Sequence, residues 1–110
     1  MLKITMIETH DERRLILEGT LVEPWITELK RVWSAARNGL EKRRLMVDLN
    51  GVTTISKEGE DRLFEMMREG AKFSCGGVLT MYLLEQIAGK CQVKLRDVMD
   101  RPTRAIETQG

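Results

Sequence analysis

The chain has 110 residues and a formal net charge of +1, from 18 basic and 17 acidic side chains. This length supports one domain around one hydrophobic core, and 42% hydrophobic with 32% charged residues is typical of a folded globular protein, not a disordered one. Both signs of charge are interleaved along the sequence. That pattern argues against nucleic-acid binding, which clusters basic residues on one face.

We expect a cytoplasmic protein without membrane insertion, because no segment has the apolar length of a membrane span and the N-terminus lacks a signal-peptide pattern. In that compartment Cys75 and Cys91 are expected to be reduced thiols that pack as small apolar side chains. His10 is the single histidine, and neither cysteine has a second ligand at metal spacing. We therefore expect no metal site and no cofactor.

The N-terminal segment has the pattern of a β-hairpin. Leu2, Ile4 and Met6 alternate with polar residues, which predicts a half-buried strand. The alternation resumes over residues 14–18 after a polar turn, and Gly19 is predicted to end this second strand.

A long amphipathic helix is predicted over residues 21–38. Thr20-Leu-Val-Glu23 has the spacing of a capping box, and Pro24 is tolerated in a first helical turn. Apolar residues then recur at spacings of three and four: Ile26, Leu29, Trp33, Ala36 and Leu40.

A buried strand is predicted over residues 45–49, ended by Asn50-Gly51 and followed by a polar loop. Ser56 then has the position of a helix N-cap. The predicted buried face of this second helix consists of Leu63, Phe64 and Met67, and Gly70 ends it.

Shorter elements follow. Residues 71–74 predict a short strand, Cys75-Gly76-Gly77 a bend, and residues 79–88 a helix. Val93, Leu95 and Val98 indicate one more small element. We assign residues 1–99 to the domain and residues 100–110 to a loosely held C-terminal tail.

This order of elements predicts an α/β fold, with a mixed sheet of about four strands covered by three to four helices. The order, together with the segment from Val47 to Gly59, resembles the STAS domain, the fold of anti-sigma factor antagonists and of the cytoplasmic tails of sulfate transporters. In that family the loop ends in an Asp-Ser-Ser-Gly-like motif, and a kinase phosphorylates the serine before the glycine. Here Ser56, Lys57, Glu58 and Gly59 take those positions.

The resemblance implies that Thr54, Ser56, Lys57, Glu58 and Gly59 form a partner-binding loop. Glu58 stands at the phosphoacceptor position, so the family's switch is not operated at this residue. One hypothesis is that Glu58 imitates phosphoserine. The alternative, which we prefer, is that it is an ordinary acidic residue in a helix's first turn, because one carboxylate carries less charge than a phosphate.

Three hydroxyls, those of Thr53, Thr54 and Ser56, remain as possible phosphate acceptors. For Ser56 we prefer N-capping, since serine is favoured there. Lys57 is expected to point to solvent, where a contact with an acidic partner surface is open to it.

Met66, Met81 and Tyr82 are candidates for an apolar partner face. Met66 falls outside the predicted inner face of its helix, whereas Met81 and Tyr82 compete for burial with Leu83, Leu84 and Ile87, which cannot all face inward. The alternative is ordinary core or half-core packing, which we prefer for methionine and tyrosine at helical spacing.

Catalytic motifs are missing from the sequence: it has no nucleophile elbow, no phosphate-binding glycine-rich loop and no metal-spaced cluster. We therefore expect a non-enzyme. The resemblance implies a regulatory protein-binding module that docks on an anti-sigma-type serine kinase without the usual phosphoserine. Two alternatives stay open. One is an accessory subunit of an ABC-type lipid transport complex that meets its ATPase. The other is a structural module that forms a homodimer through the apolar face of its second and third helices.

Overall fold

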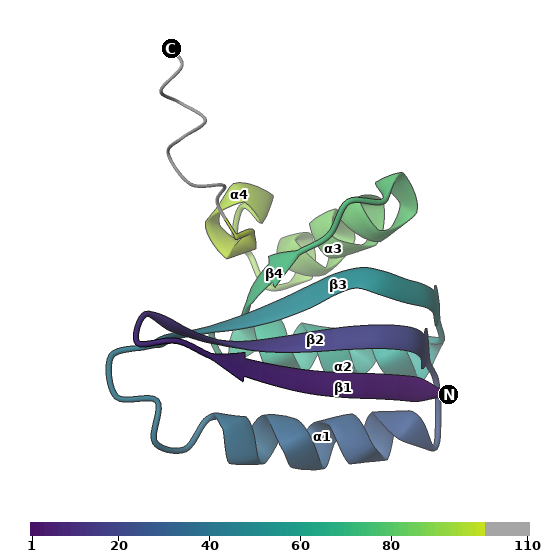
Figure 1. Cartoon of the computed structure of the whole chain (residues 1–110). Helices are drawn as coiled ribbons and strands as arrows, with labels where there is room; N and C mark the ends of the chain where they lie inside the picture. Colours follow the sequence, from purple (N-terminus) through teal and green to yellow (C-terminus); the bar gives the residue numbers. More distant parts are fainter. Residues whose placement is uncertain (101–110) are drawn as a thin grey trace.

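The computed structural model describes residues 1–100. Its elements are β1 (Leu2–Glu8), β2 (Glu12–Leu21), α1 (Trp25–Ala36), β3 (Arg44–Ile55), α2 (Lys57–Arg68), β4 (Lys72–Ser74), α3 (Val78–Lys90) and α4 (Leu95–Val98). Figure 1 shows this order along the chain. The fold is the predicted one, a mixed four-stranded sheet with four helices.

The sheet has the strand order β1-β2-β3-β4. β1 and β2 form the predicted antiparallel hairpin, with Ile4 opposite Leu17. β2, β3 and β4 are parallel, and Leu15, Val47 and Phe73 lie side by side across them. Because these three strands run in one direction, they all end at the same end of the sheet.

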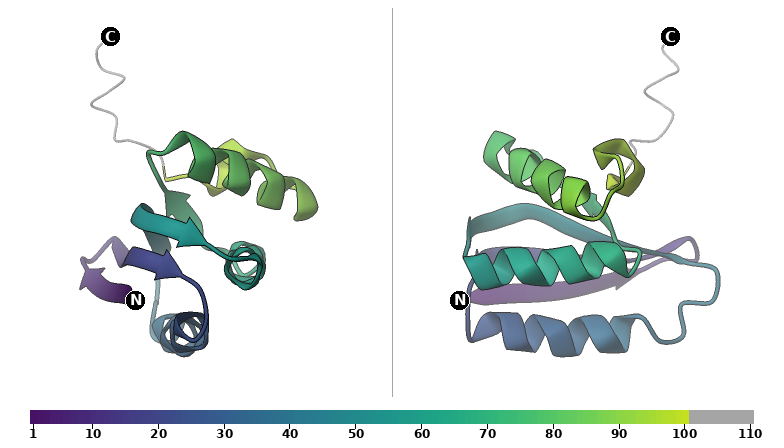
Figure 2. Two further views of the ribbon diagram at one scale, coloured as in Figure 1. Left: turned by 90° about the vertical axis from the view of Figure 1, so that its right-hand side faces the viewer. Right: turned by 180° about the vertical axis from the view of Figure 1, so that it is seen from behind.

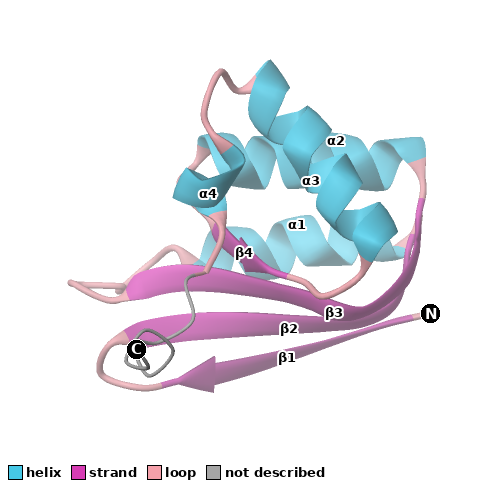
Figure 3. Ribbon diagram, turned by 90° about the horizontal axis from the view of Figure 1, so that it is seen from above, coloured by secondary structure: helices cyan, strands magenta, loops and turns pink. Residues whose placement is uncertain are grey.

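The core lies between the sheet and the helices, which lie on one side of it (Figures 2 and 3). Alternate residues of β2 and β3, among them Leu15, Leu17, Val47 and Leu49, are fully buried there. The predicted stripe of α1 packs against them through Ile26, Leu29, Trp33 and Ala36. Within residues 1–100, no helix is both long enough and apolar enough to cross a membrane.

Two strands are longer than predicted. Neither Gly19 nor Asn50-Gly51 ends its strand, because Thr20 and Leu21 continue β2 by pairing with Thr54 and Ile55 of β3. The predicted capping box from Thr20 is therefore wrong, and α1 begins only at Trp25, with Pro24 as N-cap and no side-chain cap. The predicted polar loop is mostly strand for the same reason.

The buried face of α2 also differs from the prediction. It consists of Gly59, Leu63, Met66 and Met67, whereas Phe64 is only partly buried. Met66 is 0% exposed, so its assignment to an exposed partner face is wrong. α2 contacts α1 on one flank and α3 on the other as well as β3 beneath, and these neighbours cover Met66.

The C-terminal elements agree with the sequence: the short strand is β4, the third helix is α3, and the small last element is α4. Beyond α4, Met99 bridges to Phe73, and the Asp100 N–H donates to the Phe73 carbonyl at 2.6 Å. Arg14 donates to the Asp100 carboxylate at 2.8 Å. Of the predicted tail, residues 101–110 lie outside the described residues.

Candidate partner-binding site

The residues predicted to bind a partner lie at the end of the sheet where β2, β3 and β4 finish. Since these strands are parallel and each is followed by a helix, α1, α2 and α3 all begin at this end. We call it the partner-binding end. It holds the start of α2 at Ser56 and the start of α3 at Gly77 (Figure 1).

Ser56 is the N-cap of α2, as the sequence predicted. Its hydroxyl oxygen accepts a hydrogen bond from the Gly59 N–H at 3.1 Å. The same hydroxyl donates to the Leu21 carbonyl at 3.4 Å, and the Ser56 N–H donates to that carbonyl at 3.1 Å. These bonds connect the start of α2 to the end of β2. The half-buried Ser56 hydroxyl therefore has both a donor and an acceptor partner within the protein.

Gly59 is buried because α2 passes very close to the end of β2. A Cβ atom at this position would lie 2.5 Å from the Leu21 carbonyl oxygen and 3.0 Å from Cγ2 of Ile55. Real Cβ atoms do not approach backbone oxygen so closely, so the backbone contact itself requires glycine here.

Lys57 and Glu58 are exposed in the first turn of α2. The Lys57 ammonium donates to Asp61 at 3.0 Å, and this hydrogen bond, reinforced by the charge of Asp61, raises the pKa of Lys57. Within residues 1–100 the Glu58 side chain makes no hydrogen bond or ion pair. Its carboxylate is therefore available at the surface, next to the α2 N-terminus, which favours negative charge.

Thr53 and Thr54 are among the last three residues of β3 and do not belong to a loop. The Thr53 hydroxyl donates to the Gly19 carbonyl at 3.2 Å, and Thr54 pairs with Thr20 in the ladder. Both side chains are exposed.

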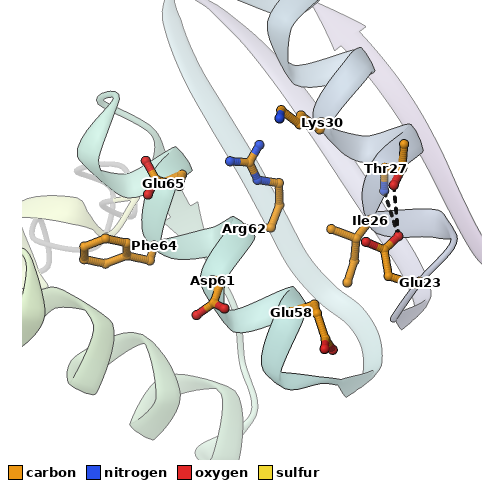
Figure 4. A pocket seen from close by; sticks show the side chains of 9 residues that line it. All are labelled: Glu23, Ile26, Thr27, Lys30, Glu58, Asp61, Arg62, Phe64 and Glu65. Carbon is orange, nitrogen blue, oxygen red and sulfur yellow. Dashed lines mark hydrogen bonds between the residues drawn. The ribbon is translucent and has the colours of Figure 1, made fainter.

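A groove of about 600 Å³ runs between α1 and α2 from the partner-binding end (Figure 4). The Trp33 indole N–H, which donates to Glu69 at 2.6 Å, holds the far ends of the two helices together. Charged side chains line most of the groove, and Ile26 and Phe64 contribute its apolar part. The charged residues are Glu23, Lys30, Glu58, Asp61, Arg62 and Glu65.

The start of α3 carries a patch of exposed apolar side chains. Val78 and Leu79 are each 83% exposed and Tyr82 is 59% exposed, whereas Met81 is half-buried. We call Val78, Leu79 and Tyr82 the α3 patch. A shallow depression joins Leu79 to Thr53 and Ile55 at the end of β3, so the patch continues toward the start of α2.

The structure thus places Thr54, Ser56, Lys57, Glu58 and Gly59 at the end of the sheet where α3 also begins, with Tyr82 exposed in the second turn of α3. It removes Met66 from the surface. Sequence reasoning missed Val78 and Leu79. The available signal was a pair of large apolar residues directly after Gly76-Gly77, outside the spacing of the buried positions Leu84, Ile87 and Ala88.

The thiol of Cys75, between β4 and α3, is partly buried. Burial, and secondarily the charge of Asp48, raises the pKa of the Cys75 thiol, so at neutral pH it is protonated. Within residues 1–100, no group of three or more histidine, cysteine, aspartate or glutamate side chains has an arrangement suited to a metal ion.

Comparison with known proteins identifies the fold. The sequence matches no protein-family profile and no curated protein. The structure resembles the crystal structure of an uncharacterized protein of the DUF3478 family from Shewanella loihica, described as having a SpoIIAA-like fold. The TM-score is 0.60 at 10% sequence identity, over 94% of this chain and 89% of the other. The chain is therefore an α/β protein with a SpoIIAA-like, that is STAS-like, fold.

Proposed function

We propose that this protein is a non-enzymatic regulatory module, related to anti-sigma factor antagonists, that binds an ATP-binding serine kinase of the anti-sigma type through its partner-binding end. The observation that carries this proposal is the exposure of Val78, Leu79 and Tyr82 at the start of α3. Leu79 lines a depression with Thr53 and Ile55, just before the start of α2. Large apolar side chains that a folded domain leaves exposed together favour a protein interface.

The composition of this end suits such an interface. Tyr82 and Leu79 supply apolar contact area, and tyrosine is enriched among the residues that dominate binding energy. Lys57 and Glu58 supply exposed charges in the first turn of α2, at the same end of the sheet, and such charges favour one orientation of a partner. Protein interfaces usually combine apolar contact area with charged groups around it.

Binding without a phosphoserine switch follows from the state of the two central residues. The Ser56 hydroxyl caps α2, so phosphorylating it would remove the cap. Glu58 has no hydroxyl, so a serine kinase cannot transfer a phosphoryl group to it. We infer that the loop presents one constant surface to the partner.

The test is affinity capture from the native cell lysate with tagged wild-type protein and with two variants, Leu79→Asp and Val93→Asp. Leu79 is in the α3 patch, and Val93, 42% exposed between α3 and α4, is the matched control for placing a charge on an exposed apolar site. We expect an ATP-binding serine kinase with the wild type and with Val93→Asp, and its loss with Leu79→Asp.

The captured kinase is then purified, and its affinity for the three proteins is measured by calorimetry. Equal affinity for wild type and Leu79→Asp would overturn the proposed surface. Capture of an ABC-type ATPase in place of a kinase would overturn the proposal that the partner is a kinase. It would assign the protein to a transport complex.

A further inference from the structure

Among residues 1–100, β1 is the outermost strand of the sheet, and no described strand pairs with its outer edge (Figure 3). At one end of the hairpin the Thr20 N–H donates to the Met1 carbonyl, and at the other the Thr9 N–H donates to the Glu12 carbonyl, both at 2.9 Å. Because antiparallel ladders alternate, the odd-numbered residues of β1 bond inward to β2. The even-numbered residues Leu2, Ile4, Met6 and Glu8 therefore direct their N–H and C=O groups outward.

This edge lacks the usual protection against pairing. Natural edge strands are shortened, bent or blocked by proline and charge, whereas β1 has seven residues, no register shift and an uncharged centre from Ile4 to Ile7. Met6 is 44% and Ile7 48% exposed. The charge of Glu8 is engaged within the chain by Arg13 and Arg43.

We propose that two copies of this chain pair through β1, antiparallel and around a twofold axis at Thr5, into one continuous eight-stranded sheet. In this register Ile4 faces Met6 of the second copy and Leu2 faces its Glu8, so all the outward-directed residues meet one another. Each such pair exchanges two backbone hydrogen bonds. If the register between the two copies shifted by one residue, each outward-directed residue would lie opposite a residue whose N–H and C=O groups already bond to β2.

The side chains match in the same register. On the helix-covered side, Ile4 packs against Met6 of the second copy, twice by symmetry, as a cross-strand apolar pair. On the other side, Lys3 lies opposite Ile7 of the second copy and covers it with its aliphatic stem, while the ammonium group stays in water. The pairing thus covers Met6 and Ile7. The pairing also leaves the α3 patch uncovered, because α3 follows β4, the strand at the opposite edge of the sheet from β1.

The first test is the molar mass in solution by light scattering, over a dilution series, for the wild type and for Met6→Pro. The Met6 N–H points outward, so proline removes a donor that only the dimer uses. We expect the wild type at twice the 12.7 kDa chain mass and Met6→Pro at the chain mass with an unchanged circular dichroism spectrum. A wild type that has the chain mass at every concentration would overturn the proposal.

The second test fixes the register and does not depend on the proline variant. Thr5→Cys and Lys3→Cys are each made with Cys75→Ser and Cys91→Ser. Opposite residues at a non-hydrogen-bonded position have Cα atoms about 4.5 Å apart, within disulfide range. The two copies of position 3 are four residues apart along the strands, about 14 Å at about 3.4 Å per residue. Mild oxidation should cross-link Thr5→Cys and leave Lys3→Cys uncross-linked. Equal cross-linking of both, or of Lys3→Cys alone, would overturn the pairing.

Discussion

The hydroxyl oxygen of Ser56 accepts a hydrogen bond from the backbone N–H of Gly59, 3.1 Å away, at the start of α2. Both residues are thus structural: Ser56 caps α2 and Gly59 lets α2 approach β2. Only Lys57 and Glu58 between them are free to face a partner.

Replacing the cap should destabilise the protein measurably. Ser56→Ala leaves the Gly59 N–H without its acceptor, and loss of a serine N-cap costs about 1 kcal/mol. Urea unfolding followed by circular dichroism measures this. Ser34→Ala, at an exposed position inside α1, is the control and should change the free energy of unfolding by less than about 0.5 kcal/mol. Equal effects of the two variants would contradict the capping role.

A methyl group at position 59 should be worse tolerated than the loss of the cap. Gly59→Ala places a Cβ atom 2.5 Å from the Leu21 carbonyl oxygen, and such overpacking costs about 1–3 kcal/mol. Gly89→Ala is the matched control, because nothing lies within 4 Å of its added Cβ and it sits inside α3. That variant should be stabilised by about 0.5–1 kcal/mol, since alanine favours helix more than glycine. A Gly59→Ala protein as stable as the wild type would show that α2 can move away from β2.

Met66 and Tyr82 should respond differently to truncation, although both were predicted for the same partner face. Met66→Ala empties part of the core and should cost about 2–5 kcal/mol. Tyr82→Ala removes an exposed side chain and should cost less than about 1 kcal/mol. Chemical denaturation of both variants measures the difference. A small loss for Met66→Ala would contradict its complete burial in the core.

The resemblance to STAS domains, which implies a phosphoacceptor position at Glu58, can be tested by introducing a hydroxyl there. If the captured kinase still recognises the loop, Glu58→Ser becomes a substrate, because the new hydroxyl lies in the first turn of a helix, where a phosphate is stabilised. Mass spectrometry after incubation with the kinase and ATP should find one phosphoryl group on Glu58→Ser and none on Glu58→Ala. An unmodified Glu58→Ser in the presence of bound kinase would show that the loop serves binding alone.

Glu8 should make the stability depend on pH on the acid side. The hydrogen bond from Arg13, followed by the charges of Arg13 and Arg43, lowers the pKa of Glu8 from its ordinary value of 4.5. The unfolded chain therefore binds the proton more readily, so this contribution is present above about pH 4.5 and is lost as the pH falls through the lower folded-state value. Glu8→Gln should be less stable than the wild type at pH 7, and the gap should narrow below pH 4.5.

The same urea titrations, run from pH 7 to pH 3, measure this narrowing. Glu85→Gln, at an exposed position on α3, is the control and should follow the wild type at each pH. A gap between Glu8→Gln and the wild type that stays constant across this range would contradict the role of the Arg13 contact.

Local patterns in the sequence predicted most of the elements correctly. The alternation around Ile4 and Leu17 identified the hairpin, and the spacing of Ile26, Leu29 and Trp33 identified α1. Ser56 was recognised as a cap because its bond reaches only to Gly59, three residues on. Each of these features depends on residues close together in the chain, so the sequence records them directly.

What only the tertiary structure decided depends on residues far apart in the chain. Leu21 and Ile55 extend their strands because they pair with each other, although 34 positions separate them, and this pairing overrides the turn signals of Gly19 and Asn50-Gly51. Met66 is buried because helices on both flanks of α2 cover it, whereas Val78 and Leu79 are exposed because α3 turns Leu84 and Ile87 inward. The sequence alone determined the elements and their order. Packing determined where the strands end, which side chains are buried in the core and which stay exposed at the surface.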